Sequence, residues 1–351
     1  MRFGHTEDQR LLGDSVRRLF GRCFTTAVVR QFADGGDLDP AWAREMAEAG
    51  LFGICAPAEA GGLGLGLVDA LPLLVEAGRH SVPYPLAETI VAAQLLAGWQ
   101  DALAAEVMEG RVRVTIAWDG DLAVTPGDRV SASLPAIAWA EHADWLLACS
   151  GDDVVLVALD DPGVQRERLG SLDLTSRVAR VVLKEASCRL LPGAASRLRR
   201  HGALLLTADM LGTSEAVLEQ TIGYLKQRRQ FGQVIGAFQS LKHIVADDAT
   251  RLESMRVALQ YAAWAVDAAA PDADIAVSIA KSYAGNAARA IAGDAVQLHG
   301  GIAYTWEFGL HLALRRIHRC AATCGGVEAH REAIAAALID QGATHHPARA
   351  A

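Results

Sequence analysis

The first third of the chain has the pattern of hydrophobic and polar positions that is typical of helices. Thr6 stands where the N-cap of a first helix is expected. Four apolar residues share one predicted face of that helix: Leu11, Leu12, Val16 and Phe20. Pro83 and Pro85 later interrupt the helical pattern, because proline lacks the backbone N–H that a helix interior needs. We therefore predict a helical domain over residues 1–111.

The middle of the chain has a different pattern, in which short β-prone runs alternate with turn residues. The runs cover residues 112–116, 145–149, 154–157 and 180–183, and Gly, Asp and Pro separate them. This spacing predicts a compact β domain over residues 112–195.

A helical period returns after residue 195 and continues almost to the end of the chain. One helix is predicted from about Ala208 to Arg228, and a longer one over residues 238–268, which at ~1.5 Å per residue would span about 45 Å. The longer helix has one apolar face, formed by Phe238, Leu241, Val245, Leu252, Met255, Leu259 and Val266. We predict a helical bundle over residues 196–342, followed by a disordered tail over residues 343–351.

Composition and charge exclude several classes of protein. The 351 residues are 51% hydrophobic and 21% charged, which indicates ordered domains with a substantial core. A net charge of -8 provides no basic field for a nucleic-acid backbone. The start of the chain lacks the apolar segment of a signal peptide, and no apolar run is long enough to cross a membrane. We therefore predict a cytoplasmic protein that binds neither nucleic acid nor membrane.

The six cysteines indicate reduced thiols rather than a disulfide framework or a metal centre. Cys320 and Cys324 are four residues apart and would share one face of a helix. No histidine or second pair completes a metal-ligand set around them. We predict two small buried residues here and no metal site.

Residues 228–239 carry the strongest functional signal in the chain. They read RRQFGQVIGAFQ and resemble the signature R-x-x-F-G-x-x-I-x-x-F-Q of the acyl-CoA dehydrogenase family. A guanidinium beside a helix start offers fixed donors and positive potential to a pyrophosphate. The resemblance implies that Arg228, Phe231 and Gln239 contact the FAD of a neighbouring subunit. The alternative is that Arg228 caps a helix and Phe231 fills the core.

A second motif of the same family lies downstream. Residues 297–307 read QLHGGIAYTWE, where the family has Q-x-x-G-G-x-G-[FY]-T-x-E, and Ala303 replaces the third glycine. The resemblance implies that Gln297, Gly300 and Gly301 line the ADP half of the same inter-subunit FAD site. The alternative is a helix C-cap with one surface glutamine.

The resemblance implies a mainly α fold with a β middle domain: an N-terminal helical domain, a β-barrel domain and a C-terminal four-helix bundle. Residues 57–64, which read PAEAGGLG, match the family's P-x-E-x-G-G-x-G loop. The match weakens where the family has T-E-P-x-x-G-S-D, a segment that packs on the flavin ring and the acyl thioester. This segment should follow Ala117, and residues 118–121 there read WDGD. The β domain is therefore expected to be shortened and to lack its own flavin-facing segment.

The catalytic base of the family is missing from its usual places. An acyl-CoA dehydrogenase needs a carboxylate in a dry pocket to remove the proton α to the thioester, while the β-hydrogen leaves as hydride to the flavin. The resemblance places this base at Gly325 in most members and at Gly202 in a minority, and glycine cannot accept a proton. Glu328 and Asp209 remain weak candidates, because their helices would have to shift or turn. Glu328 more simply complements the N-terminal end of the last helix.

Two histidines near these positions are further candidates for moving protons. His201 precedes one of the base positions, and His299 lies inside the second FAD motif. For His299 a positional role is the simpler expectation.

The presence of FAD-contact motifs and the absence of a base together predict a degenerate subunit of a heteromeric acyl-CoA dehydrogenase. The pattern is similar to the short subunits of heterotetrameric actinobacterial enzymes that shorten steroid side-chain CoA thioesters. The expected partners are a second, longer subunit in an α2β2 complex, an acyl-CoA substrate, and an electron-transfer flavoprotein or similar acceptor. Two alternatives remain: a self-sufficient homo-oligomeric dehydrogenase with an atypical base, and a flavin-free structural or acyl-CoA-binding module.

Overall fold

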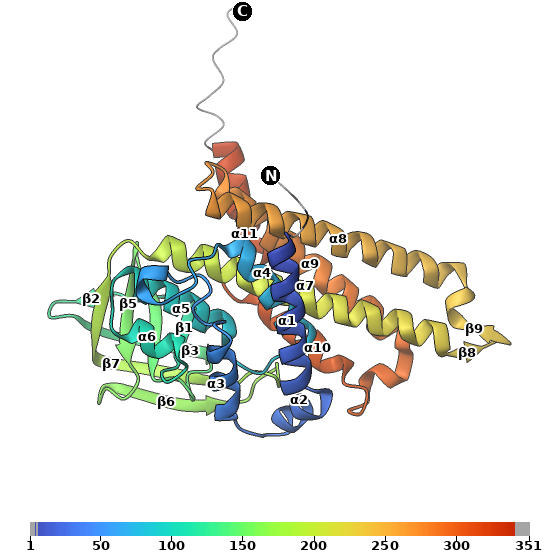
Figure 1. Ribbon diagram of the computed structural model, residues 1–351, viewed down its shortest axis with the longest axis horizontal. Coiled ribbons are helices and arrows are strands. Elements are labelled where there is room, and N and C mark those ends of the chain that lie inside the picture. The colour runs from blue at the N-terminus through green and yellow to red at the C-terminus, as the bar shows by residue number, and fades with distance from the viewer. Residues whose placement is uncertain (1–3, 5, 341–351) are drawn as a thin grey trace, which may run out of the picture.

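Long C-terminal helices extend away from a β sheet, and shorter N-terminal helices pack alongside both (Figure 1). The computed structural model describes residues 4 and 6–340. Helices occupy residues 7–108, strands residues 114–191, and mainly helices residues 195–340. The predicted fold class is therefore confirmed. The tail predicted over residues 343–351 lies outside the described residues.

The N-terminal helices begin where the sequence provides caps. They are α1 (Glu7–Cys23), α2 (Thr26–Ala33), α3 (Pro40–Glu48), the 3-10 turn η1 (Ala58–Ala60), α4 (Leu67–Arg79), α5 (Leu86–Gly98) and α6 (Leu103–Met108). Thr6 forms the expected capping box with Gln9: the Gln9 N–H donates to Thr6 Oγ1 at 3.2 Å, and the Thr6 N–H donates to Gln9 Oε1 at 3.0 Å. Placing Leu11 on the apolar face of α1 was wrong, since its side chain is 60% exposed. Leu11 lies about 140° around the helix from the buried Val16, at ~100° per residue.

The middle strands form one sheet in the order β1-β4-β5-β7-β3-β2, with β6 paired to β7. Their bounds are β1 (Val114–Asp121), β2 (Val124–Thr125), β3 (Arg129–Ala138), β4 (Trp145–Ser150), β5 (Asp153–Ala158), β6 (Val164–Leu169) and β7 (Val178–Leu191). The pair β1-β4 is parallel, and the other pairs are antiparallel. The long strand β7 pairs with β5 through its last residues and with β3 and β6 through its first ones, so the sheet folds around a core of its own.

The C-terminal helices form the bundle. Their bounds are α7 (Ala195–Gln227), α8 (Gln239–Asp267), α9 (Ala273–His299), α10 (Leu310–Ala322) and α11 (Val327–Ala335), with the short elements β8 (Arg229–Gln230), β9 (Gln233–Val234), η2 (Ile235–Ala237), η3 (Gly300–Tyr304) and η4 (Ala336–Asp340). The helix that ends before Arg228 begins at Ala195, earlier than the predicted start near Ala208. Its first half is buried on several sides, so the amphipathic period that reveals a surface helix is absent there.

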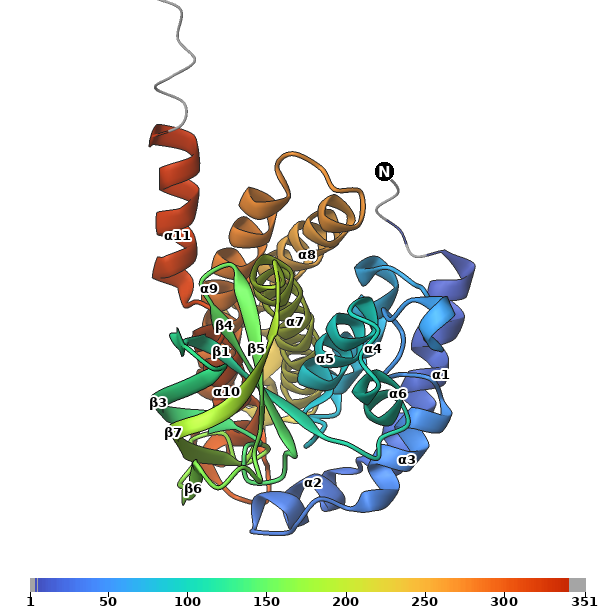
Figure 2. The same ribbon diagram turned by 90° about the vertical axis from the view of Figure 1, so that its left-hand side faces the viewer.

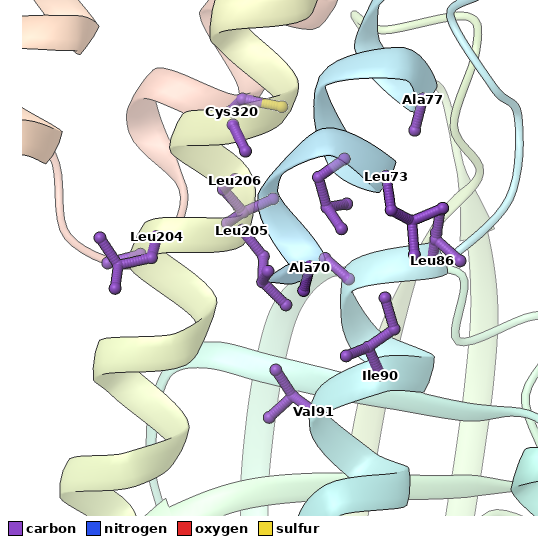
Figure 3. Close-up of a cluster of buried hydrophobic side chains, with 14 of the residues drawn as sticks. Ala70, Leu73, Ala77, Leu86, Ile90, Val91, Leu204, Leu205, Leu206 and Cys320 are labelled. Carbon is purple, nitrogen blue, oxygen red and sulfur yellow. The ribbon is translucent and has the colours of Figure 1, made fainter. Parts of the chain in front are cut away.

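Helix α7 runs between the sheet and the N-terminal helices and joins the three parts of the fold (Figure 2). Leu204, Leu205 and Leu206 are all buried, although they point in different directions from the helix. Figure 3 shows Leu205 and Leu206 on the side of α7 that faces α4 and α5, Leu204 on the opposite side, and Cys320 of α10 nearby. The first half of α7 is therefore packed on more than one side by other parts of the fold.

A buried arginine on α10 ties the same three parts together. Arg316 is 3% exposed, and its guanidinium donates to both carboxylate oxygens of Asp209 on α7, at 2.8 and 2.5 Å. It also donates to the Val82 carbonyl of the N-terminal part and to Thr175 Oγ1 beside the sheet, both at 3.0 Å. These hydrogen bonds of the Arg316 guanidinium are all made to groups of the protein. The side chain therefore fixes the relative position of the N-terminal helices, the sheet and the bundle.

Two further sequence predictions can be compared with the structure. Placing Cys320 and Cys324 on one helix face was wrong: α10 ends at Ala322, and Cys324 lies in the following loop with a φ of 60°. Both thiols are nevertheless buried, as expected. Among the described residues, no helix has the length and apolarity that a membrane span requires.

Candidate functional site

The first FAD motif forms a tight hairpin at the end of the bundle far from the sheet (Figure 1). Strands β8 and β9 pair, and Phe231 and Gly232 stand between them with φ values of 49° and 79°. Positive φ at both central residues is the geometry of a type I′ turn, which favours glycine or asparagine. A phenylalanine there costs of order 1–3 kcal/mol. Such strain in a turn residue points to a functional constraint.

Phe231 does not fill the core, because its side chain is 89% exposed. Its ring lies edge-on to Phe238, with centroids 6.1 Å apart. Arg228 is also exposed, and its backbone holds it in place: its N–H donates to the Tyr224 carbonyl, and its own carbonyl accepts from Ile235, both at 2.8 Å. Gln239 is exposed at the first residue of α8. The three predicted contact residues of this motif therefore all face solvent in the isolated chain.

The second motif ends α9 and begins the turn η3. Gly300 closes the helix with a φ of 64°, and no atom lies within 4 Å of where a Cβ would stand at Gly300 or Gly301. Gln297 is exposed one turn earlier. An open glycine pair lets a ligand approach the backbone closely. Ala303, at the position of the family's third glycine, is buried and 1% exposed.

The two motifs meet through a stack of aromatic rings. The ring of Tyr224, at the end of α7, lies 4.6 Å from the imidazole of His299, at the end of α9. His299 Nδ1 donates to the Ala295 carbonyl at 2.8 Å, and Phe308 packs against the imidazole at 4.8 Å. Burial lowers the pKa of His299, so the ring is neutral near pH 7. These contacts are consistent with the positional role expected for His299.

The two positions at which the resemblance places the family's base, Gly202 and Gly325, lie close to residues 118–121. Gly202 lies in α7 against the indole of Trp118, and a Cβ on Gly202 would stand 2.2 Å from Trp118 Cζ3. Gly325 lies in the loop before α11 with a φ of 77°, and its N–H donates to Asp119 Oδ1 at 2.7 Å. Residues 118 and 119 therefore contact both positions, and Trp118 blocks the one at Gly202.

The weak base candidates are engaged in other contacts. Asp209 is the buried ion-pair partner of Arg316 described above. Glu328 lies in the first turn of α11 with its side chain 85% exposed, beside Arg331 at 3.3 Å. His201 is buried with Nδ1 donating to Gln94 Oε1 at 2.5 Å, and burial lowers its pKa to about 3. Neither carboxylate occupies a dry pocket with room for a substrate, and His201 stays neutral.

Among the buried carboxyl groups that the sequence interpretation missed, Glu88 lies closest to residues 118–121, because it contacts Trp118. Glu88 on α5 is 3% exposed, and Trp118 Nε1 donates to its Oε1 at 3.3 Å. Burial raises the pKa of Glu88. The signal in the sequence is one acidic residue within the apolar run of α5, at the first turn of the helix.

Comparison with known proteins supports the resemblance seen in the motifs. Residues 6–106 match the family "Acyl-CoA dehydrogenase, N-terminal domain", and residues 191–339 match "Acyl-CoA dehydrogenase, C-terminal domain". The chain is 33% identical to acyl-CoA dehydrogenase FadE34 of Mycobacterium tuberculosis, over 86% of this chain but 43% of FadE34. It is 30% identical to acyl-CoA dehydrogenase IpdE2 of Mycolicibacterium smegmatis, over 91% of this chain and 95% of IpdE2. The chain therefore spans less than half of FadE34 and almost all of IpdE2.

Solved structures agree over nearly the whole chain. A variant of the Tcur3481-Tcur3483 steroid ACAD superposes with a TM-score of 0.89 and 31% identity, covering 96% of this chain and 99% of that one. A chain of the ChsE4-ChsE5 complex from Mycobacterium tuberculosis superposes with a TM-score of 0.88 and 27% identity, covering 99% and 100%. Motifs, fold and sequence identity lead to one conclusion: the chain belongs to the acyl-CoA dehydrogenase family of FAD-dependent oxidoreductases.

Proposed function

We propose that this chain is a subunit of a heteromeric acyl-CoA dehydrogenase, and that it contributes contacts to the FAD held by a catalytic partner chain. The observation that supports this best is the exposure of Arg228, Phe231, Gln297 and Gly301 at one end of the bundle. Phe231 combines a left-handed backbone with 89% exposure, so the chain itself gains little from it. These groups are available to a ligand that another chain holds.

The exposed groups fit the chemistry of FAD. The Arg228 guanidinium presents a planar fork of donors that suits a pyrophosphate. The open backbone at Gly300 and Gly301 leaves room for a ribose or a phosphate, and the Gln297 amide offers both a donor and an acceptor. When bound, FAD accepts the hydride that leaves the β-carbon of the acyl thioester. In this proposal the residues of this chain bind and orient the cofactor, and the proton is removed elsewhere.

The covered base positions support a partner that supplies the base. Trp118 fills the space beside Gly202, and Gly325 donates its N–H to Asp119, so neither position carries the side-chain carboxylate that a base needs. An α-proton abstraction without a positioned base loses ~10²- to 10⁴-fold in rate. A complete active site therefore requires a second chain, which we propose is a longer acyl-CoA dehydrogenase subunit in an α2β2 complex.

The C-terminal bundle is the proposed contact surface. Most large apolar side chains that are exposed among the described residues lie there: Phe231, Val257, Trp264, Ile279, Tyr283, Ile302, Tyr304, Trp306, Leu338 and Ile339. An obligate interface of ~2,000 Å² or more would cover such a surface. The described relatives include a ChsE4-ChsE5 complex, which supports a heteromeric assembly here.

The proposed substrate is an acyl-CoA thioester from steroid or lipid breakdown. This substrate class rests on the relative described as a steroid ACAD. An electron-transfer flavoprotein or a similar acceptor is the proposed oxidant of the reduced FAD. Both assignments follow from family membership and not from a residue of this chain.

Purification tests the proposed function. The chain should be colourless when it is purified alone and should copurify with FAD when it is produced with its longer partner. A yellow lone chain that oxidises an acyl-CoA would instead support a self-sufficient dehydrogenase. A chain that remains colourless with every candidate partner would support a flavin-free binding module.

One observation favours the alternative of a self-sufficient dehydrogenase. Glu88 is a buried carboxyl group with a raised pKa, and it contacts Trp118, which in turn packs against Gly202. Glu88→Gln in the assembled complex should leave flavin reduction within about tenfold of wild type, and Glu328→Gln should do the same, since neither is the base. Loss of a true base costs ~10²- to 10⁴-fold. A fall of three orders of magnitude with FAD still bound would identify the base in this chain.

A further inference from the structure

We propose that Trp118 occupies the space in which an acyl group would otherwise sit in this chain, so that the chain holds no substrate of its own. The inference rests on the proposed function and deepens it. On this proposal, Trp118 confines the reaction to the active site of the partner chain.

Trp118 stands at the first position of the segment that replaces the family's flavin- and thioester-facing sequence. It lies on β1, where five consecutive residues are buried instead of every second one. Ala117 faces the core inside the sheet, whereas Trp118 faces the opposite core, among the helices. The largest side chain available therefore points from the sheet toward α5 and α7.

The indole and a side chain at position 202 exclude each other. A Cβ on Gly202 would stand 2.2 Å from Trp118 Cζ3 and 2.6 Å from Cε3, and real carbon atoms do not approach so closely. Position 202 is one of the two places where the family has its base. With Trp118 in place, neither a glutamate there nor the acyl group that it would face has room.

The indole is also held from the other side. Trp118 Nε1 donates to Glu88 Oε1 on α5 at 3.3 Å, and the whole residue is only 6% exposed. The ring therefore spans from α7 to α5. A buried tryptophan whose N–H has a partner is fixed in orientation, which a mobile lid would not be.

Asp119 contacts the second of these positions, Gly325, through hydrogen bonds. Its carboxylate accepts from the Cys324 N–H at 3.1 Å and from the Gly325 N–H at 2.7 Å. A Cβ on Gly325 would stand 2.9 Å from His330 Nε2. The loop is thus fixed in a conformation that only glycine readily adopts, since the φ of Gly325 is 77°.

A pocket of about 340 Å³ opens outside Trp118 and Asp119, and its lining includes Trp118, Val277 and Cys324 as well as Asp274 and His330. Trp118 forms part of the wall of this pocket, so the pocket lies outside the space that the indole itself fills.

Binding of octanoyl-CoA to the full chain tests the proposal by calorimetry. Trp118→Gly should bind octanoyl-CoA saturably, with competition from indole, whereas wild type and the bulky control Trp118→Phe should bind at least tenfold more weakly. Free CoA serves as the ligand control. If Trp118→Gly binds indole but not octanoyl-CoA, Trp118 is an ordinary core residue and the proposal is wrong. The proposal is also wrong if wild type binds octanoyl-CoA as tightly as Trp118→Gly does.

A second experiment covers the case in which Trp118→Gly does not fold. Gly202→Ala should lower the Tm of wild type, because the new methyl group meets the indole. In a Trp118→Leu background the same change should raise the Tm, because alanine is the better helix former. The same sign in both backgrounds would contradict the mutual exclusion. Neither readout involves FAD or a partner, so a failure here is distinct from a failure of the proposed function.

Discussion

The ring of Tyr224 lies 4.6 Å from the imidazole of His299, and this stack joins the ends of α7 and α9. Each residue neighbours one FAD motif: the Tyr224 carbonyl accepts from the Arg228 N–H at 2.8 Å, and His299 directly precedes Gly300. The relative position of the two motifs is therefore set by packing behind them, away from any ligand.

The stack predicts a role for a residue that touches no cofactor. His299→Ala should lower FAD retention in the assembled complex about three- to tenfold, since an aromatic pair is worth ~0.5–1.5 kcal/mol. His299→Phe keeps the ring and should restore most of the retention, which a loss of helix stability alone would not explain. The exposed His318→Ala on α10 is the matched control. FAD content after gel filtration measures the effect, and equal retention in His299→Ala and His318→Ala would exclude this positioning role.

Arg228 is predicted to hold FAD through its charge. Arg228→Ala removes a charged donor worth ~1.5–3 kcal/mol when it is bonded to an anion, so the FAD dissociation constant of the complex should rise about ten- to hundredfold. Arg229→Ala removes the same charge from the next exposed residue and should change the FAD dissociation constant much less. If both substitutions weaken FAD equally, the effect is general electrostatics and not a contact by Arg228.

The ion pair of Arg316 and Asp209 is predicted to be a major determinant of stability. Asp209→Asn leaves a buried guanidinium without its counter-charge and should lower the free energy of unfolding by ~3–5 kcal/mol. Glu167→Gln breaks the exposed pair with Arg180, which is 2.8 Å long, and should cost less than ~1 kcal/mol. Urea unfolding measures both values. A loss below ~1 kcal/mol for Asp209→Asn would show that the junction does not depend on this pair.

His201 predicts a dependence of stability on pH. Burial lowers the pKa of folded His201 to about 3, below its ordinary value of 6.5, so folding favours the neutral ring. The stabilisation is complete above pH 6.5 and is lost as the pH falls toward 3, with a slope of up to ~1.4 kcal/mol per pH unit. His201→Gln should reduce the slope of the free energy of unfolding against pH, between about pH 6 and 4, by the contribution of one bound proton. An unchanged slope in urea unfolding at these pH values would contradict the burial of a neutral His201.

The sequence predicted those features that rest on local chemistry. The capping box of Thr6 identified the start of α1, and the apolar face of residues 238–268 identified α8, because capping and amphipathic periodicity are properties of the local sequence. The early start of α7 was missed for the opposite reason: Leu204, Leu205 and Leu206 are buried together, so no polar face marks that part of the helix.

The sequence could identify the candidate site only in part. The two FAD motifs were recognisable because their residues are close together in the chain. The contacts of Trp118 with Glu88 and Gly202 join residues that are far apart in sequence, and no periodicity connects them. The same is true of Arg316, whose partners lie on three parts of the fold.

Native mass spectrometry with flavin quantitation tests the central claim most directly. The chain is produced together with the longer acyl-CoA dehydrogenase subunit proposed as its partner, and the mass and FAD content of the complex are measured. On the proposed function this chain contributes contacts to a partner's FAD and has glycine at both base positions, so we predict an α2β2 complex with two FAD. A stable homotetramer of this chain that holds four FAD and turns over acyl-CoA would contradict the account.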